Sequence, residues 1–575
     1  MEEKELEILR HGCSHVLAKA VDKIFAGAKN TIGPAIDDGF YYDFDLNESI
    51  TPEDFNKIEK EMKKIISQNQ EFKRVVVSKE EAKKMFKDNP YKQELVDAVP
   101  EGEEVSIYYL GDDWYDLCRG PHVATTKELK DFAFKINRVS GAYWRGDEKN
   151  KMLQRVYVYG YEKQDELNEH IRLLEEAKKR DHRKLGKDLG LFFISDYAQG
   201  MPFYMPKGLI VKNQLIDFWR QEHEKAGYIE IETPIAMSRS LWEVSGHWGH
   251  YRKNMYTFAV EDSEFAIKPM NCPGGMLFYK ENVHSYKEFP LRVGELGKVH
   301  RHEASGTLHG LFRVRSFTQD DAHIFMLPSQ IESEIQNVLS LVDKMYSAFG
   351  LTYHLELSTM PEDHMGDEKT WEEAENALKN ALKNIGKEFV INEGDGAFYG
   401  PKIDIHIKDA IGRTWQCGTI QLDMQLPKRF NLEYVDVDGS KKEPVMIHRV
   451  IYGSIDRFLG IITENFAGAF PLWLAPVQVE VLNINDSVLD YAKSIADKLK
   501  SFGFRVEVDD RNEKIGKKIR EAQLQKVPYM LIIGENEKAN NNICVRSRNG
   551  GDLGTQNLDD FIKEIIDERD TKKIM

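Results

Sequence analysis

The pattern of apolar residues changes along this 575-residue chain, and that change excludes a single compact core. Over residues 4–27, apolar side chains recur every three or four positions, which is the period of a helix with one buried face. Residues 191–474 contain many short strand-like runs, separated by helical segments such as residues 329–349. Over the last hundred residues, strands alternate with helices. We therefore expect several domains with different architectures.

These patterns predict an α+β multidomain protein in four parts. Residues 1–161 combine helix, turn and strand signals and predict a mixed α+β domain. Residues 162–187 lack proline and carry alternating charges, which indicates an exposed connecting helix. Residues 188–474 favour a large antiparallel sheet. Residues 475–575 are typical of a small doubly wound α/β domain.

Composition excludes several classes of protein. A net charge of −16 argues against coating nucleic acid by bulk charge, although it leaves room for local basic patches. The five cysteines are scattered along a long chain, so a disulfide framework is not expected. We find neither the apolar core of a signal peptide nor a run of about 20 apolar residues. We therefore expect a cytoplasmic protein without a membrane span.

Two pairs of metal- or proton-handling residues lie in the first predicted domain, His11 with His15 and Cys118 with His122. Residues four apart on a helix share one face, so the two histidines can point at one spot. Such a pair suits metal binding or proton transfer. An amphipathic helix with two ordinary histidines explains the first pair better when it is taken alone. The second pair makes a functional site the better explanation.

Residues 297–325 are dense in arginine, histidine and paired acids. Arg301 precedes a flexible loop, and Arg313 and Arg315 follow it. Because guanidinium groups bind phosphate bidentately, this strand-loop-strand segment is a candidate triphosphate clamp. A solvated basic face is the alternative, and charge alone favours it.

Three motifs in this chain resemble those of the class II aminoacyl-tRNA synthetases. They are GYIEIETP with Pro234, VHRHE with Arg301 and Glu303, and GSIDR with Arg457. The third motif has Asp where the class usually has Glu, which keeps a carboxylate beside the arginine. Over essentially the whole chain the sequence resembles the threonine–tRNA ligase family. The resemblance implies an antiparallel-sheet catalytic core, an N-terminal editing domain and a C-terminal anticodon-binding domain.

Three further segments, MNCPGG, QDDAHIF and MIHRVIYGS, carry the resemblance to the threonine family in particular. In that family the corresponding residues bind one zinc ion, which implies the ligands Cys272, His323 and His448. A zinc ion that coordinates the amino group and the hydroxyl of threonine would reject valine by a factor of about 10⁴–10⁵. Serine lacks only a methyl group, a difference worth roughly 10–200-fold, so an editing site is needed.

The family resemblance also assigns roles around ATP and threonine. It implies Arg301 on the α-phosphate, Glu303 near adenine, and Arg313 and Arg457 on the distal phosphates, with Mg²⁺ sharing the phosphate charge. Arg301 and Arg457 are the expected catalytic residues, and Phe317 is a further expected ATP contact. The expected amino-acid and adenylate contacts are Met270, Gln319, Asp321, Tyr399, Gln416, Thr419 and Ser454.

In the first domain, the resemblance places an ester of mischarged Ser-tRNA among His11, His15, Cys118 and His122. The residues expected to position substrate and water are Tyr42, Lys92 and Asp116. Related alanine-type editing domains bind zinc with this set of four residues. The threonine family works without a metal here, and we expect the same.

The last domain contains a local basic segment, because residues 512–526 hold five basic and two acidic residues. By family position, the anticodon-reading candidates are Asn512, Arg520, Glu537 and Arg546. An ordinary solvated helix explains the charges nearly as well.

The expected partners are tRNA(Thr), ATP and L-threonine, and the expected assembly is a homodimer through the catalytic domain. Many family members begin with a small ubiquitin-like domain, and this chain starts almost directly at the predicted editing helix. Two rival interpretations are an RNA-binding regulator derived from a synthetase and a freestanding deacylase with a vestigial synthetase body. The intact Arg301, Arg457 and zinc triad argue against a decayed active site.

Overall fold

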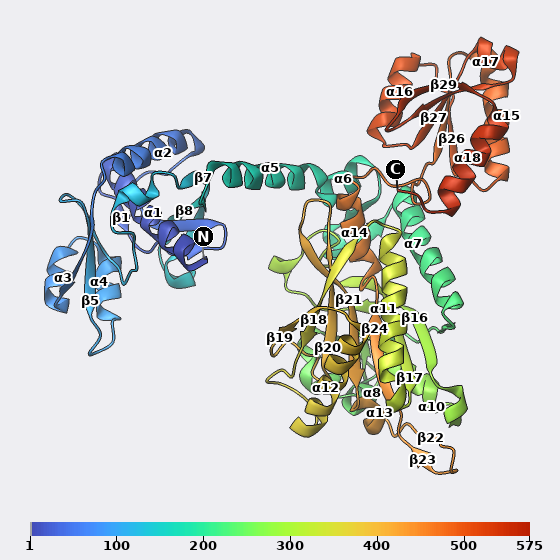
Figure 1. Cartoon of the computed structure of the whole chain (residues 1–575), viewed down its shortest axis with the longest axis horizontal. Helices are drawn as coiled ribbons and strands as arrows, with labels where there is room; N and C mark the ends of the chain where they lie inside the picture. The colour runs from blue at the N-terminus through green and yellow to red at the C-terminus, as the bar shows by residue number, and fades with distance from the viewer. Residues whose placement is uncertain (1–2, 575) are drawn as a thin grey trace. The chain divides into compact units, whose positions relative to one another are not determined.

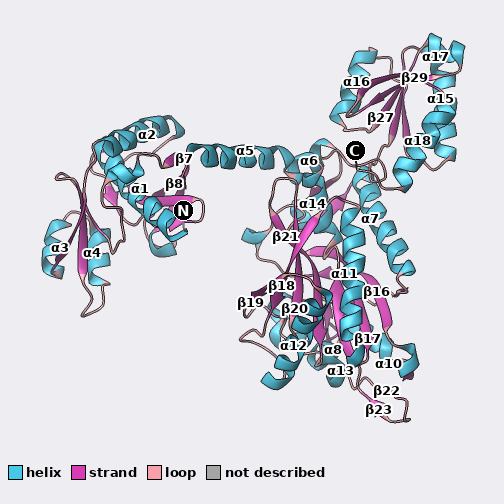
Figure 2. Cartoon of the chain, in the orientation of Figure 1, coloured by secondary structure: helices cyan, strands magenta, loops and turns pink. Residues whose placement is uncertain are grey.

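The computed structural model describes residues 3–574 and divides into two compact units, Met1–Glu175 and Glu176–Met575. Figures 1 and 2 show the elements of both units. The boundary falls within α5 (Gln164–Arg180), and α6 (His182–Asp188) follows it. The expected single connecting helix over residues 162–187 is thus two helices. The break is at Asp181, whose side chain accepts a hydrogen bond from the Arg183 N–H and caps α6.

The first unit contains two sheets and four helices that precede α5. One sheet has the order β1-β3-β8-β7, with β2 paired to β3, and the other has the order β4-β5-β6. The strands of the first sheet are β1 (Lys29–Asn30), β2 (Ala35–Ile36), β3 (Gly39–Asp45), β7 (Ala133–Tyr143) and β8 (Met152–Tyr161). The second sheet consists of β4 (Phe72–Val77), β5 (Val105–Leu110) and β6 (Tyr115–Leu117). The helices are α1 (Glu3–Ile24), α2 (Pro52–Ser67), α3 (Lys79–Met85) and α4 (Pro90–Asp97).

Helix α1 buries the face that its sequence period predicts. Val16, Leu17, Ala20 and Val21 are fully buried in a core that they share with Phe40 of β3. At about 25 cal/mol per Å² of apolar surface, this face fixes the helix against the sheet far more strongly than helix propensity does. It therefore also fixes where the two histidines of α1 point.

The second unit is built on an eight-stranded sheet with the order β11-β16-β17-β24-β21-β20-β18-β19. Its neighbouring strands are antiparallel except for the two outer pairs, β11 with β16 and β18 with β19. The strands are β11 (Ile229–Glu230), β16 (Leu291–His300), β17 (Ser316–Met326), β18 (Thr352–Ser358), β19 (Phe389–Asn392), β20 (Lys402–Lys408), β21 (Thr414–Asp423) and β24 (Val445–Val450). The motif GYIEIETP contributes the two-residue strand β11 to this sheet.

One face of this sheet carries the main hydrophobic core, and the other face carries polar side chains. Ile403, Ile405 and Ile407 of β20 pack in the core with helices, whereas Asp404 between them points to the opposite face. The helices that contribute to this core are α6, α7 (Pro206–Lys225), α11 (Ile331–Ser347), α12 (Glu368–Ile385) and α14 (Ile455–Asn465). The sheet therefore presents its polar face to a ligand while the helices support it from behind.

Short elements surround the large sheet. The small sheets are β9 (Phe192–Ile194) with β10 (Pro202–Tyr204), then β12 (Ala236–Ser238), β14 (Ser263–Ile267) and β13 (Tyr256–Val260), and finally β15 (His284–Ser285), β22 (Tyr434–Val435) and β23 (Lys441–Lys442). The short helices are α8 (Arg239–Val244), α9 (His247–His250), α10 (Cys272–Lys280) and α13 (Leu426–Arg429).

The last domain has a five-stranded sheet with the order β26-β25-β27-β28-β29 and helices on both faces. Its first three strands are parallel, as expected for a doubly wound domain, but β28 and β29 are antiparallel and make the sheet mixed. The strands are β25 (Val479–Asn483), β26 (Val506–Asp509), β27 (Tyr529–Ile533), β28 (Ile543–Ser547) and β29 (Gly551–Gln556). The helices are α15 (Leu489–Ser501), α16 (Ile515–Leu524), α17 (Glu535–Asn540) and α18 (Leu558–Asp570).

Within residues 3–574, every helix is too short or too polar to traverse a lipid bilayer.

Candidate active site

A cavity of about 850 Å³ opens on the polar face of the large sheet. Its walls include residues of β17, β21 and β24. They also include residues of the segment between β16 and β17, residues 301–315, which we call the arginine loop. The predicted site residues that line it are Met270, Cys272, Arg301, Glu303, Arg313, Phe317, Gln319, Asp321, Tyr399, Gln416, Thr419, His448, Ser454 and Arg457. The structure thus gathers residues from motifs that are far apart in the sequence. His323 is buried just behind them.

The arginine loop presents cations from both of its ends. Arg301 follows β16 and donates from Nε to the Pro269 carbonyl at 3.1 Å, and its guanidinium lies 5.2 Å from the centroid of the Phe317 ring. Arg313 donates from Nε to the Glu303 carboxylate at 3.1 Å. The Arg301 Nη groups and part of the Arg313 fork remain available for anions, which suits two or more phosphates.

The third motif forms the turn into α14. Gly453 has φ +81, and a Cβ there would lie 2.4 Å from the Cys417 carbonyl oxygen, so only glycine fits this turn. The Ser454 hydroxyl accepts the Arg457 backbone N–H at 3.2 Å and caps the helix. The Arg457 Nε is buried and has no hydrogen-bond partner, and the residue lines the cavity. An unpaired buried guanidinium nitrogen indicates that an anion belongs beside it.

Asp456 of the same motif does not face the cavity. Its carboxylate is fully buried and accepts hydrogen bonds from Lys212 Nζ at 2.9 Å, the Tyr204 hydroxyl at 2.6 Å and the Thr318 N–H at 2.7 Å. Burial alone would raise the pKa of Asp456, but Lys212 and Lys298 hold it below its usual value. This carboxylate therefore fastens α14 to α7 and β17.

Polar contacts hold the predicted amino-acid side of the cavity in place. Gln416 Nε2 and the Thr419 hydroxyl both donate to the Asp404 carboxylate, at 2.6 and 3.1 Å. The Tyr399 hydroxyl donates to the Gln421 side-chain carbonyl at 2.5 Å. Sequence reasoning missed Asp404 and Gln421. Asp404 could have been found from the alternating pattern KIDIHI, because it is the one acid on the strand face opposite the isoleucines.

Trp415 and Arg449 also line the cavity and were not predicted. Arg449 is buried, its Nη groups have no hydrogen-bond partner, and its guanidinium lies 4.3 Å from the centroid of the Tyr228 ring. Nothing in the local sequence separates it from an ordinary core arginine.

The predicted zinc ligands Cys272, His323 and His448 are all buried, and their ligand atoms lie within 4.8 Å of one another. His323 and His448 are direct cross-strand partners of β17 and β24, and Cys272 is the first residue of α10. The His448 Nε2 lies 2.8 Å from an oxygen of Asp423, which leaves its Nδ1 as the ligand atom. Metal-binding histidines usually donate their other nitrogen to a carboxylate in this way.

An unsatisfied atom supports the same interpretation. The His323 Nε2 is buried without a hydrogen-bond partner, which is costly unless a ligand fills the space. Burial and the charges of His448 and Arg449 lower the pKa of His323 well below its usual value, so the ring stays neutral and able to bind a metal. The residues present therefore fit a Cys-His-His zinc site with an open position toward the cavity. His247 lies at the edge of this group, with its Nε2 3.8 Å from the Cys272 sulfur.

A second cluster lies in the first unit, where the fold joins α1 to the segment after β6. The Cys118 sulfur lies 3.3 Å from His11 Nε2 and 3.2 Å from His122 Nε2, and the ring of His15 is 4.3 Å from that of His122. The His11 Nδ1 lies 3.0 Å from the Pro121 carbonyl and must donate to it. The Nε2 of His11 is therefore the free lone pair that accepts the thiol hydrogen.

The other three predicted editing residues join this cluster from separate elements. Tyr42 on β3 donates to an oxygen of Asp116 on β6, and Lys92 on α4 pairs with the other oxygen at 2.5 Å. The His15 Nδ1 lies 4.0 Å from the same carboxylate. Lys92 and Asp116 are nearly inaccessible to solvent, so they form a buried pair that holds Tyr42 beside the histidines.

Burial keeps this cluster uncharged around the histidines. Burial and the charge of His11 lower the pKa of His122 to about 2, and burial with the neighbouring charges lowers the pKa of His15 well below its usual value. Burial also raises the pKa of the Cys118 thiol to about 11. At neutral pH the site therefore offers neutral imidazoles that can accept a proton.

The four predicted anticodon residues are spread over the last domain. Asn512 follows β26 and is exposed, and Arg520 is exposed on α16. Glu537 on α17 is half-buried and caps its own helix by accepting the Gly534 N–H at 2.9 Å. Arg546 lies in β28 with a buried, unpaired Nε. Among these four described residues, no direct hydrogen bond or ion pair is found, and both Glu537 and Arg546 lie near enough to Cys544 to shift its pKa.

The basic segment over residues 512–526 is less exposed than its sequence indicates. Lys518 is buried, and its Nζ donates to the side chain of Asn483 at 3.0 Å and to the Asp509 carbonyl at 2.7 Å. Lys517 is paired with Glu513 at 2.6 Å. One of the five positive charges therefore has a structural role.

Comparisons with known proteins agree with this architecture. Three family descriptions match: "Threonyl and Alanyl tRNA synthetase second additional domain" over residues 105–157, "tRNA synthetase class II core domain (G, H, P, S and T)" over residues 256–466, and "Anticodon binding domain" over residues 478–568. The threonine–tRNA ligase of Clostridium tetani is 58% identical over 99% of this chain and 91% of its own. That of Clostridioides difficile is 56% identical over 100% of this chain and 90% of its own.

A solved structure is also similar. The RNA binding domain of threonyl-tRNA synthetase from Cryptosporidium parvum has a TM-score of 0.66 and 45% identity, over 68% of this chain and 98% of that one. The sheet, the cavity and the core-domain match define a class II aminoacyl-tRNA synthetase. Within that class, the chain belongs to the threonine–tRNA ligase family. The predicted family and fold class are thereby confirmed.

Proposed function

We propose that this chain activates L-threonine with ATP, transfers it to tRNA(Thr), and hydrolyses Ser-tRNA(Thr) in a separate editing site. The family relation confirms the predicted activity of a threonine–tRNA ligase with an editing domain. The observation that carries the assignment to residues is the cavity on the large sheet, which Arg301 and Arg457 line together with Cys272 and His448 of the buried triad.

Activation uses the charge and geometry of the cavity. Arg301 holds the α-phosphate, Arg313 and Arg457 hold the distal phosphates, and Mg²⁺ bound with ATP shares their charge. The threonine carboxylate then attacks the α-phosphorus in line, and pyrophosphate leaves. Because the nucleophile is already ionised, the chain's residues contribute positioning and charge stabilisation. The terminal ribose of tRNA takes the acyl group from the adenylate in the second step.

Cys272, His323 and His448 would hold Zn²⁺, with Asp423 orienting His448. When bound, the metal supplies a Lewis acid for the amino group and the side-chain hydroxyl of threonine. Valine has no hydroxyl, so it would lack the second of these contacts and bind less well. Asp321 and Tyr399 line the same part of the cavity and position the substrate's polar groups.

In the editing site, a neutral imidazole of the α1 pair takes a proton from water as the water attacks the seryl carbonyl carbon. The bond from that carbon to the ribose oxygen then breaks, and the imidazolium returns the proton to the ribose oxygen, which releases serine and free tRNA. Cys118 and His122 bound the space for the ester, and the Lys92–Asp116 pair holds the Tyr42 hydroxyl, which donates to Asp116. The histidines perform this step without a metal.

We also propose the division into editing residues 1–161, linker 162–187, catalytic residues 188–474 and anticodon-binding residues 475–575, and a homodimer through the catalytic domain. Asn512, Arg520, Glu537 and Arg546 read the anticodon. A cytoplasmic location stays a prediction.

The test is ATP–pyrophosphate exchange with threonine, serine and valine. We expect strong exchange with threonine, weaker exchange with serine and almost none with valine. An absence of threonine-dependent exchange would contradict the proposal. Preserved tRNA binding without exchange would then favour the regulatory interpretation, and preserved Ser-tRNA hydrolysis the freestanding deacylase.

Cys272→Ala tests the zinc assignment. Since the triad provides the only predicted zinc ligands, the variant should lose bound zinc and at least about 100-fold of threonine-dependent exchange. Metal analysis and exchange kinetics measure both quantities. Cys544→Ala, in the last domain, is the matched control and should retain both. Normal zinc content in Cys272→Ala would refute the assignment.

A further inference from the structure

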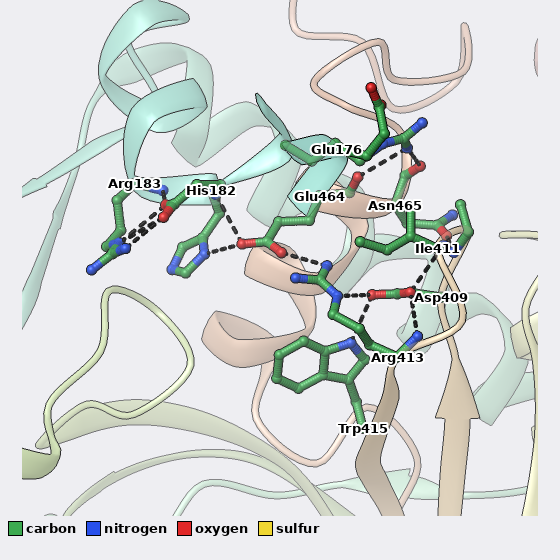
Figure 3. Close-up of polar contacts among 12 residues, drawn as sticks. Glu176, His182, Arg183, Asp409, Ile411, Arg413, Trp415, Glu464 and Asn465 are labelled. Carbon is green, nitrogen blue, oxygen red and sulfur yellow. Dashed lines mark hydrogen bonds and ion pairs between the residues drawn. The ribbon is translucent and has the colours of Figure 1, made fainter. Parts of the chain in front are cut away.

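His182 is a fully buried histidine outside the residues assigned above. It is the first residue of α6, and Figure 3 shows its contacts with Glu464. The Nδ1 lies 2.7 Å from an oxygen of Glu464, which also accepts the His182 backbone N–H at 3.0 Å. On the other side of the ring, Nε2 accepts the backbone N–H of Leu311 at 2.9 Å.

The second contact reaches the turn of the arginine loop. At Gly310, with φ +50, a Cβ would lie 2.1 Å from His182 Nε2, so the ring is packed directly against the backbone of the turn. The ring of Phe312 lies 4.1 Å from that of His182 and 4.4 Å from that of Trp415. Leu311, Phe312 and Trp415 all line the cavity. The histidine therefore supports the cavity wall from behind.

The first contact reaches a rigid ion-pair network. The second oxygen of Glu464 accepts from Arg413 at 2.6 Å, and Arg413 also bonds Asp409 at 2.7 Å. Asp409 accepts the Trp415 Nε1–H at 3.0 Å, which closes the network onto the cavity wall (Figure 3). Burial alone would raise the pKa of Glu464, but the hydrogen bonds from His182 and the charge of Arg413 lower it. Glu464 is therefore a carboxylate and a firm anchor for the ring.

These contacts fix the form of the imidazole. The Nδ1 must carry the hydrogen, because its partner is a carboxylate, and Nε2 must be a lone pair, because its partner is an N–H. Only the neutral ring with hydrogen on Nδ1 makes both bonds. A phenylalanine of similar size would fill the space and leave a buried N–H of the loop unsatisfied.

We propose that His182 is a positioning residue for ATP. Its ring connects the Glu464 network to the turn of the arginine loop through one hydrogen bond on each side. It holds residues 309–313 in the conformation that places Arg313 at the cavity. This inference rests on the proposed binding of ATP to the arginine loop. It predicts that loss of the Leu311 hydrogen bond weakens ATP binding more than threonine binding.

Two substitutions separate the two hydrogen bonds. In His182→Asn, the amide nitrogen can replace Nδ1 and keep the bond to Glu464, but nothing reaches Leu311. In His182→Gln, the amide oxygen can replace Nε2 and accept the Leu311 N–H, but the bond to Glu464 is lost. His182→Ala removes both. His354→Ala, an exposed histidine of β18, is the matched control.

The full-length variants are assayed by ATP–pyrophosphate exchange with ATP and threonine varied separately, and by thermal unfolding. We expect His182→Ala and His182→Asn to raise KM for ATP about tenfold and KM for threonine less than twofold. His182→Gln should recover most of the ATP affinity. His354→Ala should match the parent chain.

An unchanged KM for ATP in His182→Asn would overturn the inference. So would equal kinetics of the Asn and Gln variants with equally lowered melting temperatures, which a purely structural role predicts. Arg313→Ala separates this inference from the proposed function. If Arg313→Ala raises KM for ATP and the His182 variants do not, only the positioning role fails. If none of the variants changes KM for ATP, the assignment of ATP to the arginine loop fails as well.

Discussion

At the scale of single residues, this chain holds two clusters of the same residue types in different electrostatic settings. The Cys-His-His triad of the catalytic sheet has an orphaned nitrogen and a carboxylate behind one ring, as a metal site requires. In the editing cluster, Cys118 lies within hydrogen-bonding distance of two histidines. Its single thiol hydrogen can go to only one of the two rings, and the Nδ1 atoms of His15 and His122 are buried without a hydrogen-bond partner.

The lowered pKa values of the editing histidines predict an unusual pH profile. An ordinary histidine has a pKa near 6.5 and would lose its proton-accepting form below that pH. Burial lowers the pKa of His15 and His122, so their neutral forms persist as the pH falls. We expect Ser-tRNA hydrolysis to be nearly constant between pH 8 and about pH 5.5, measured under single-turnover conditions. A rate that halves near pH 6.5 would contradict this, and His11→Ala/His15→Ala gives the background rate.

At the scale of elements, buried ion pairs decide how the helices meet the catalytic sheet. Asp456 belongs to a motif that resembles a catalytic one, yet its carboxylate connects α14, α7 and β17. The Asp that stands here in place of the usual Glu therefore affects how α14 packs, because this side chain does not line the cavity. Arg457, one residue further on, faces the cavity because successive positions of a helix point in different directions.

Asp456→Asn should destabilise the catalytic unit. The substitution leaves the buried Lys212 without a countercharge, and breaking such a pair costs about 3–5 kcal/mol. We expect the melting temperature of the unit to fall by several degrees in scanning calorimetry. Asp217→Asn removes an exposed carboxylate from the same α7 helix and should leave it unchanged. Equal melting temperatures of the two variants would show that the pair adds no stability.

At the scale of the whole molecule, the chain consists of compact units, each with its own core. Because the cores are separate, we expect that the editing unit can be deleted without unfolding the catalytic unit. Such a division also explains how an acidic protein handles tRNA, since local basic groups on particular domains can bind it without a basic overall charge.

A fragment of residues 162–575 should keep activation and lose editing. It retains the whole of α5 and the catalytic core, so threonine-dependent exchange should stay within about threefold of the full chain. Serine supplied with tRNA should then accumulate as Ser-tRNA, which acid-gel analysis detects. A folded fragment that fails to exchange, or that still clears Ser-tRNA, would contradict this division.

Arg520→Ala should affect tRNA and leave activation intact. Arg520 is exposed on α16, and losing a contact to RNA should raise KM for tRNA about tenfold. Pyrophosphate exchange does not require tRNA and should stay unchanged. Lys517→Ala is the control, because Lys517 already pairs with Glu513. If both substitutions raised KM for tRNA equally, the effect would come from the lost positive charge, and the specific role of Arg520 would be contradicted.

Much of this organisation was predictable from the sequence, because it depends on local periodicity. The helical period of α1 places His11 and His15 on one face, and the strand-loop-strand pattern places Arg301 and Arg313 at two ends of one loop. The break at Asp181 was missed, since a capping aspartate within a charged helical segment differs little from a solvated one. The antiparallel strands β28 and β29 were also missed, because periodicity does not report strand direction.

Which distant side chains lie next to one another in the sites became visible in the tertiary structure. The register of β17 with β24 sets His323 against His448, and the packing of α10 adds Cys272, although no local spacing connects these three residues. The same holds for His182, which looks like one more residue of a charged linker until Glu464 and Leu311 are placed around it. Local patterns and motifs were enough to predict most of the elements and the family. Long-range strand pairing and burial decided the sites, because they set which distant side chains lose water together.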